Sequence, residues 1–171
     1  MLTPEAILSF PSLITPRARS EGGEPVFSCT LLFTAAAQKD PLFAKLKAAA
    51  EAAAKERFDG KIPAGLKSPF RDGNEKDYSG YAGTVFISPW SKQKPGIVDE
   101  NVEALIDPDR LYPGVIVRAD VKPFAWSVSG NKGVSFGLNH LQIIREGERM
   151  DGRSSPSSVF SAVASDNDSP F

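Results

Sequence analysis

Apolar and polar residues alternate along several stretches of the chain, and this period of two predicts β-strands. The clearest is 26–34 (VFSCTLLFT), in which alternate residues form one apolar side: Phe27, Cys29, Leu31 and Phe33. Further strands are predicted over 6–19, 82–90, 114–128 and 132–145. In the first of these, Leu8, Phe10 and Ile14 share one parity and are expected on the same face, and the prolines favour an edge strand or a bulge.

A helix is predicted over residues 40–58, between the second and third strands. Asp40 suits the N-cap, Pro41 suits the first helical position, and the alanine-rich middle has high helical propensity. The apolar stripe is narrow and composed largely of alanine, so the helix can lie close to a sheet. Gly60 is placed to end it.

About five strands and one inserted helix indicate a mainly β (α+β) fold. A five-stranded Greek-key barrel of the OB-fold type has these elements, and so does a small β-sandwich. Residues 1–150 are expected to form this domain. Residues 151–171 are serine-rich without apolar periodicity, which predicts a disordered tail.

Composition argues against several classes of protein. The 171 residues contain one cysteine, Cys29, which is expected to be a buried thiol, and one histidine, His140. The chain can therefore form neither an intrachain disulfide nor a Cys/His zinc cluster. His140 lies in a predicted strand, which argues against its role in a Ser-His-Asp triad. Phosphate-binding glycine motifs are absent. We predict a protein without enzymatic activity, cofactor or metal, and a nuclease using Asp72, Asp77 or Asp120 is the enzymatic alternative.

No apolar run reaches the ~20 residues of a membrane span, and the first ten residues lack the basic start of a secretory signal. The protein is therefore expected to remain inside the cell. The formal net charge is -1. A nucleic-acid role would have to come from the distribution of charge rather than from its sum.

Residues 115–126 (VIVRADVKPFAW) combine cations and aromatic rings on one face of a strand. The odd positions are apolar, whereas the even positions include Arg118, Lys122, Phe124 and Trp126. Cations can follow a phosphate backbone while flat rings stack on bases of any sequence. The alternative is a solvated face in which both rings are covered by a loop after Pro123.

Other basic and aromatic residues flank this strand. Trp90 ends the predicted strand 82–90 and is followed by lysines, whereas Phe86 fits a second core under the helix slightly better than a stacking role. The loop 66–81 mixes cations with aromatic rings, although its carboxylates cancel the charge. The predicted DNA-binding residues are Arg71, Lys76, Tyr78, Tyr81, Trp90, Lys92, Lys94, Arg118, Lys122, Phe124, Trp126 and Lys132.

Four stretches resemble a phage family of single-stranded DNA-binding proteins with an OB fold, first described as a domain of unknown function. They are SPFRDGNEKDYSGYAG, Lys94-Pro95-Gly96, LYPGVIVRADVKPF and GNKGVSFGLNHLQIIREGERMDGR. The resemblance extends from about residue 6 to residue 153. It implies binding of single-stranded DNA in phage replication, recombination or repair, in the cytoplasm of the infected bacterial host.

The chain ends in DNDSPF, which is similar to the acidic, aromatic-terminated tails of bacterial and phage single-strand binders. By that similarity the tail binds phage or host replication proteins through Asp166, Asp168, Pro170 and Phe171. Taken alone, these residues also fit an ordinary chain end. The alternative function is a phage protein-interaction module that binds no nucleic acid.

Overall fold

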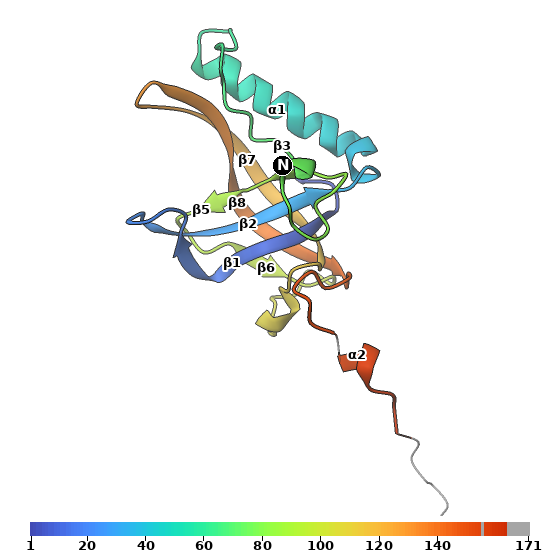
Figure 1. Cartoon of the computed structure of the whole chain (residues 1–171). Helices are drawn as coiled ribbons and strands as arrows, with labels where there is room; N and C mark the ends of the chain where they lie inside the picture. Colours follow the sequence, from blue (N-terminus) through green and yellow to red (C-terminus); the bar gives the residue numbers. More distant parts are fainter. Residues whose placement is uncertain (155, 164–171) are drawn as a thin grey trace, which may run out of the picture.

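The computed structural model describes residues 1–154 and 156–163 (Figure 1). The strands are β1 (Ala6–Ala18), β2 (Pro25–Phe33), β3 (Arg71–Asp72), β4 (Val85–Ile87), β5 (Trp90–Ser91), β6 (Gly96–Val98), β7 (Ile116–Val128) and β8 (Asn131–Arg145). The α-helices are α1 (Pro41–Arg57) and α2 (Pro156–Val159), and short 3-10 turns cover Ala37–Lys39, Gly73–Glu75 and Pro108–Arg110.

Five of the strands close into a ring. β1 is antiparallel to β2 and to β7, and β7 is antiparallel to β8. The ring is completed by β5, which is antiparallel to β2 and parallel to β8. This order, β1-β2-β5-β8-β7, confirms the five-stranded OB-type barrel and excludes the sandwich. β3 and β4 extend the sheet beyond β2, and β6 pairs with β8.

The core fills the barrel as the alternation predicts. On β7, Val117, Ala119 and Val121 are almost completely buried. On β8 the buried positions change from even to odd numbers where the register shifts opposite Asp120. The shift places one extra residue, Asn139, on β8, so that both halves of this long strand keep their apolar side inward.

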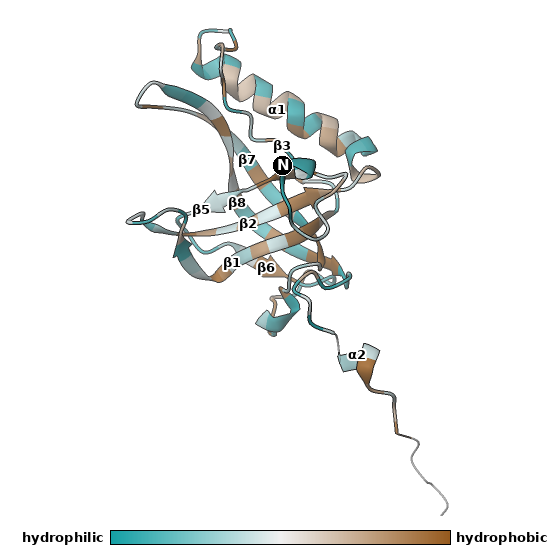
Figure 2. Cartoon of the chain, in the orientation of Figure 1, coloured by the Kyte–Doolittle hydropathy of each residue, from teal (hydrophilic) through white to brown (hydrophobic). Residues whose placement is uncertain are grey.

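The helix α1 begins and ends close to its predicted limits. The Asp40 side chain accepts a hydrogen bond from the Leu42 amide at 2.9 Å, which caps the first turn. Phe43, Leu46 and Ala54 are buried, and α1 packs against β7 and β8. Figure 2 shows hydrophobic colour on the barrel strands and hydrophilic colour on the β1–β2 turn. No helix among the described residues is long and apolar enough to span a membrane.

The register of β1 differs from its prediction. Its pairing with β2 is irregular after Ser9, and Phe10 has a left-handed φ of 43° immediately before Pro11. This bulge exposes Phe10 and Ile14 and turns Leu13 into the core instead.

The predicted strand 82–90 is divided into β4 and β5, because Pro89 has no amide hydrogen to continue the ladder. Phe86 is buried, as the core interpretation predicts. It packs with Leu32 and Tyr81 in a second cluster that the loop carrying Tyr81 covers, rather than α1.

Candidate nucleic-acid interface

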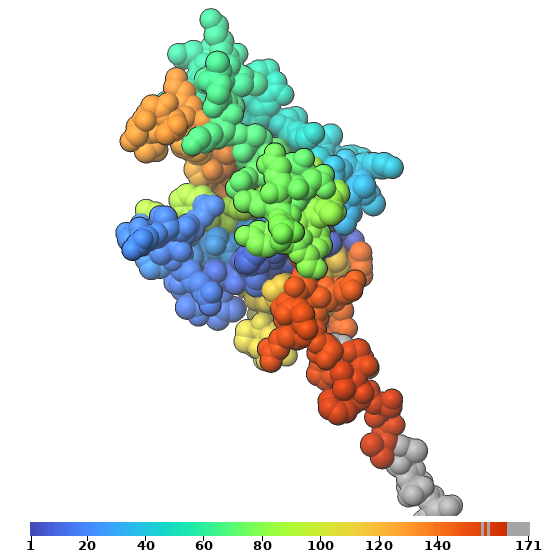
Figure 3. Space-filling model, in the orientation of Figure 1, coloured from blue at the N-terminus to red at the C-terminus, as the bar shows by residue number. Residues whose placement is uncertain are grey.

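A groove of about 490 Å³ lies on the outside of the barrel, and we name it the barrel groove. Figure 3 shows a hollow between the projecting β1–β2 turn and the tip of the β7–β8 hairpin. The residues that line the groove are Arg19, Lys67, Ser68, Pro69, Arg71, Ser88, Trp126, Val134, Ser135 and Phe136. They come from the turn after β1, from β3 and the segment before it, from the link between β4 and β5, and from the hairpin.

The position of the Trp126 ring follows from the pairing of β7 with β8. Trp126 is opposite Gly133, and its Nε1 donates a hydrogen bond to Ser135 Oγ at 3.0 Å. A Cβ added at Gly133 would lie 2.4 Å from Trp126 Cζ2. The indole therefore lies directly over the backbone of β8, in space that only glycine leaves open, and it remains half-buried with one side toward the groove.

A pair of aromatic rings, Trp90 and Phe124, lies beside the groove. Trp90 is paired with Gly137 of β8, and its ring contacts Phe124 edge-on with centroids 5.9 Å apart. The Arg19 guanidinium lies 5.8 Å from the centroid of Trp90, and burial lowers the pKa of Arg19. β7 continues through Pro123, so the chain does not turn there into the covering loop of the alternative interpretation. The rings and the cation meet at the end of the groove nearest the β1–β2 turn.

The groove is positively charged. Its lining contains Arg19, Lys67 and Arg71, and it contains no carboxylate. Within residues 1–154 and 156–163, none of these three cations forms an ion pair. Cations without counter-charges beside flat rings can bind a phosphate backbone and stack its bases.

Of the other predicted DNA-binding residues, some lie near the barrel groove and the rest lie elsewhere on the surface. Lys122 is exposed on the same face as Phe124, and Lys92 forms an ion pair with Glu24 at 3.2 Å. Lys76 and Tyr78 lie on the loop that covers the second cluster, and Tyr78 packs against exposed Phe10. Lys94 lines a separate depression with Ile106, and Lys132 lies on the far face of the hairpin, 5.1 Å from the Phe58 ring.

Tyr81 has no ring face to offer to DNA. Its side chain is only 2% exposed, and its hydroxyl donates a hydrogen bond to Ser9 Oγ at 2.8 Å. Burial is the main cause that raises its pKa. The prediction of Tyr81 as a DNA-binding residue was therefore wrong. The spacing of aromatic residues in the loop 66–81 does not indicate which ring packs inward.

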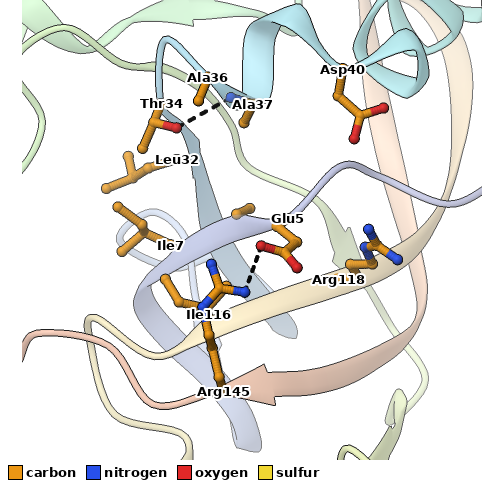
Figure 4. Close-up of a pocket in the computed structure, with 11 residues that line it drawn as sticks. Glu5, Ile7, Leu32, Thr34, Ala36, Ala37, Asp40, Ile116, Arg118 and Arg145 are labelled. Atoms are coloured by element: carbon orange, nitrogen blue, oxygen red, sulfur yellow. Dashed lines mark hydrogen bonds and ion pairs between the residues drawn. The ribbon is translucent and has the colours of Figure 1, made fainter.

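Arg118 is also distant from the groove, although it shares a face of β7 with Trp126. They are eight positions apart, which is roughly 26 Å along a strand. Figure 4 shows Arg118 in another pocket, near Glu5, Asp40 and Arg145. Arg118 Nε is buried without a hydrogen-bond partner among the described residues. The predicted single surface of cations and rings on β7 is therefore divided between two places.

Two groove cations, Arg19 and Lys67, were missing from the predicted site. Arg19 follows β1 in the β1–β2 turn, and turns at this position take part in oligonucleotide binding by OB folds. Lys67 is placed by a bridge to Gly133, with its amide bonded to the Lys132 carbonyl at 2.9 Å. The predicted OB-fold topology could have indicated Arg19, because it places the first turn at the binding face. Lys67 could not be found in this way, because its bridge to Gly133 joins segments far apart in the sequence.

Two of the three carboxylates of the nuclease alternative have other partners. Asp72 accepts a hydrogen bond from the Asn74 amide, and Asp120 forms an ion pair with the Met1 ammonium group at 2.8 Å. That ammonium group lowers the pKa of Asp120. Among the described residues, no three His, Cys, Asp or Glu side chains gather where they could hold a metal ion.

A closed five-stranded barrel with a basic, aromatic groove between its first turn and its last hairpin defines the OB-fold class of oligonucleotide-binding domains. Within this class, the chain belongs to the family of the single-stranded DNA-binding protein of Enterobacter phage Enc34, whose model matches residues 1–170. Protein p50 of Acyrthosiphon pisum secondary endosymbiont phage 1 is 30% identical over 155 residues, which are 85% of this chain and 83% of that protein.

Solved structures share the fold. The single-stranded DNA-binding protein of bacteriophage Enc34, in complex with ssDNA, aligns with a TM-score of 0.75 and 21% identity. The alignment covers 86% of this chain and 87% of that one. The single-stranded DNA-binding protein gp2.5 of bacteriophage T7 aligns with a TM-score of 0.60 and 14% identity, over 91% of this chain and 96% of that one.

Proposed function

We propose that this chain binds single-stranded DNA in the barrel groove, without sequence preference and without catalysing a reaction. Its setting is phage DNA replication, recombination or repair in the cytoplasm of the infected bacterium. The observation that supports this most is the set of three unpaired cations, Arg19, Lys67 and Arg71, beside the Trp126 ring. Family membership supports the same ligand.

The groove accounts for both affinity and the absence of sequence preference. Each phosphate neutralised on a single strand contributes about −0.7 to the slope of log K against log salt, so three contacts contribute about −2. Each base stacked on a ring contributes about 1–3 kcal/mol whatever its identity. The other predicted residues near the groove, Lys92, Lys122, Phe124 and Trp90, extend the same surface toward the β1–β2 turn.

The test is the salt dependence of binding to labelled oligo-dT, measured by anisotropy for the wild type and for Arg19→Gln/Lys67→Gln/Arg71→Gln. The variant should bind more weakly, with a slope shallower by about 2. Lys39→Gln/Lys45→Gln is the matched control, since both lysines are exposed at the start of α1 and away from the groove. Equal slopes in all three proteins would refute the site, and no binding by the wild type would favour a protein-interaction module.

The absence of catalysis is tested in the same samples. We expect oligo-dT to remain intact after incubation with magnesium, because Asp72 and Asp120 are engaged with Asn74 and the Met1 ammonium group. Magnesium-dependent shortening of the DNA, lost in Asp72→Asn, Asp77→Asn or Asp120→Asn, would contradict this part of the proposal.

We further propose that residues 151–171 form a separate tail that attaches replication proteins. Its expected contact residues, Asp166, Asp168, Pro170 and Phe171, lie outside the described residues. Deletion of residues 161–171 should leave folding intact, maintain or increase affinity for DNA by removing negative charge, and weaken attachment to the phage polymerase or helicase. A truncated protein that no longer binds DNA would contradict the division at residue 150.

A further inference from the structure

A second depression, of about 360 Å³, lies at the end of α1, and we name it the helix-end groove. Its lining residues are Arg57, Phe58, Asp59, Lys61, Pro63, Ser127 and Lys132. Three of these are cations, and Asp59 is the one carboxylate in the lining. No ion pair involving Arg57, Lys61 or Lys132 occurs among the described residues. The groove therefore has a net positive charge facing solvent.

Two of the three cations lie beside an aromatic ring. Lys132 Nζ and Arg57 Cζ lie 5.1 and 5.7 Å from the centroid of Phe58. Arg57 can also stabilise the carboxyl end of α1, where the helix dipole is negative. Lys61 and Lys132 lie outside the helix, so the helix dipole does not explain them. This groove thus repeats, on a smaller scale, the combination of cations and ring found in the barrel groove.

The Trp126 and Lys132 side chains lie on opposite faces of the same hairpin end. Gly133 is opposite Trp126, on the face of the barrel groove, whereas Lys132 is opposite Ser127, on the face toward α1. Lys67 lies at the boundary, because its backbone is bonded to Lys132 and Val134 while its side chain lines the barrel groove. The residues at the hairpin tip, 128–131, are exposed and uncharged.

We propose that a single strand of DNA longer than the barrel groove continues around the hairpin tip and binds its next phosphates in the helix-end groove. This inference rests on the proposed function of the barrel groove and adds a second stretch to the DNA path. In this path the strand passes Trp126 before it reaches Lys61 and Lys132.

The experiment compares oligo-dT of increasing length, from about 4 to about 20 nucleotides, because OB folds cover about 4–16 nucleotides. The variant is Lys61→Gln/Lys132→Gln, and the matched control is Lys39→Gln/Lys45→Gln at the other end of α1. We expect wild-type affinity for the shortest oligonucleotides in the variant. For the longest we expect a loss on the order of tenfold and a salt slope shallower by about 1.4.

The variant Lys61→Gln/Lys132→Arg should recover part of the long-oligonucleotide affinity and about half of the lost salt slope, since it returns one of the two charges, the one beside Phe58. Thermal melting of each variant checks that the hairpin remains folded. A variant that matches the control at every length would overturn the inference, and so would an equal loss at every length, because that result indicates a general effect of charge or folding. Failure of the wild type to bind any length would instead refute the proposed function itself.

Discussion

Replacement of Gly133 by alanine should weaken DNA binding without changing any charged or aromatic residue. The new Cβ would lie 2.4 Å from Trp126 Cζ2 and 2.7 Å from Cε2, distances that real Cβ contacts essentially never show. The Lys67 Cβ, at 3.1 Å, closes the other side. The indole must therefore move off β8, and its hydrogen bond to Ser135 at 3.0 Å must break.

The size of the effect is bounded by what the ring contributes. One stacked base is worth about 1–3 kcal/mol, so affinity for oligo-dT should fall between about fivefold and about 150-fold. Anisotropy titrations at one salt concentration measure this loss. The salt slope should stay at its wild-type value, because Arg19, Lys67 and Arg71 retain their charges.

Gly137→Ala is the matched control on the same strand and face. A Cβ there meets only the Lys122 carbonyl oxygen at 3.6 Å, an ordinary contact, so the Trp126 ring should keep its place. The double variant Gly133→Ala/Trp126→Ala should bind no more weakly than Trp126→Ala alone, because both changes remove the same interaction. Fully additive losses, or wild-type affinity in Gly133→Ala, would refute the placement of the indole in the DNA path.

Three further predictions concern the barrel. Burial raises the pKa of the Cys29 thiol to about 12, so a thiol reagent at pH 8 should label the protein only upon unfolding, and rapid labelling of the native protein would contradict this. Leu31 is fully buried, and Leu31→Ala should cost about 2–5 kcal/mol in urea unfolding with an unchanged m-value, whereas a cost below about 1 kcal/mol would place it outside the core. The Met1 ammonium group lowers the pKa of Asp120, so the ion pair stabilises the fold above the unfolded pKa of about 4 and is lost as the pH falls through the folded pKa. Asp120→Asn should therefore reduce the melting temperature slightly at pH 7 and not near pH 2, and an equal reduction at both would contradict the assignment.

The fold could be predicted where the alternation is strict. The core sides of β2 and β7 follow from their sequences, since side chains of a strand alternate between its faces. The same rule failed for Phe10 and Ile14, because a bulge before Pro11 changes which residues face inward. The sequence alone did not decide between a closed barrel and a β-sandwich, since five strands with one helix suit both folds.

The site was less predictable than the fold. Alternation places Arg118 and Trp126 on one face of β7, but a shared face does not make a shared site: eight positions hold them roughly 26 Å apart, and Arg118 lies in another pocket. Arg19 and Lys67 reach the groove from segments that come together only in the folded barrel. Tyr81 is buried because it packs on Phe86 and bonds to Ser9, contacts that the spacing of aromatic residues in a loop does not specify.

The most direct test of the DNA-binding groove is tryptophan fluorescence during a titration with oligo-dT. The chain has two tryptophans, and both lie in or beside the barrel groove: Trp126 lines it and Trp90 lies under Arg19. We predict saturable quenching whose midpoint shifts to higher DNA concentration as salt increases. Emission that stays constant while an independent assay shows the DNA fully bound would place the DNA elsewhere on the protein and contradict the account.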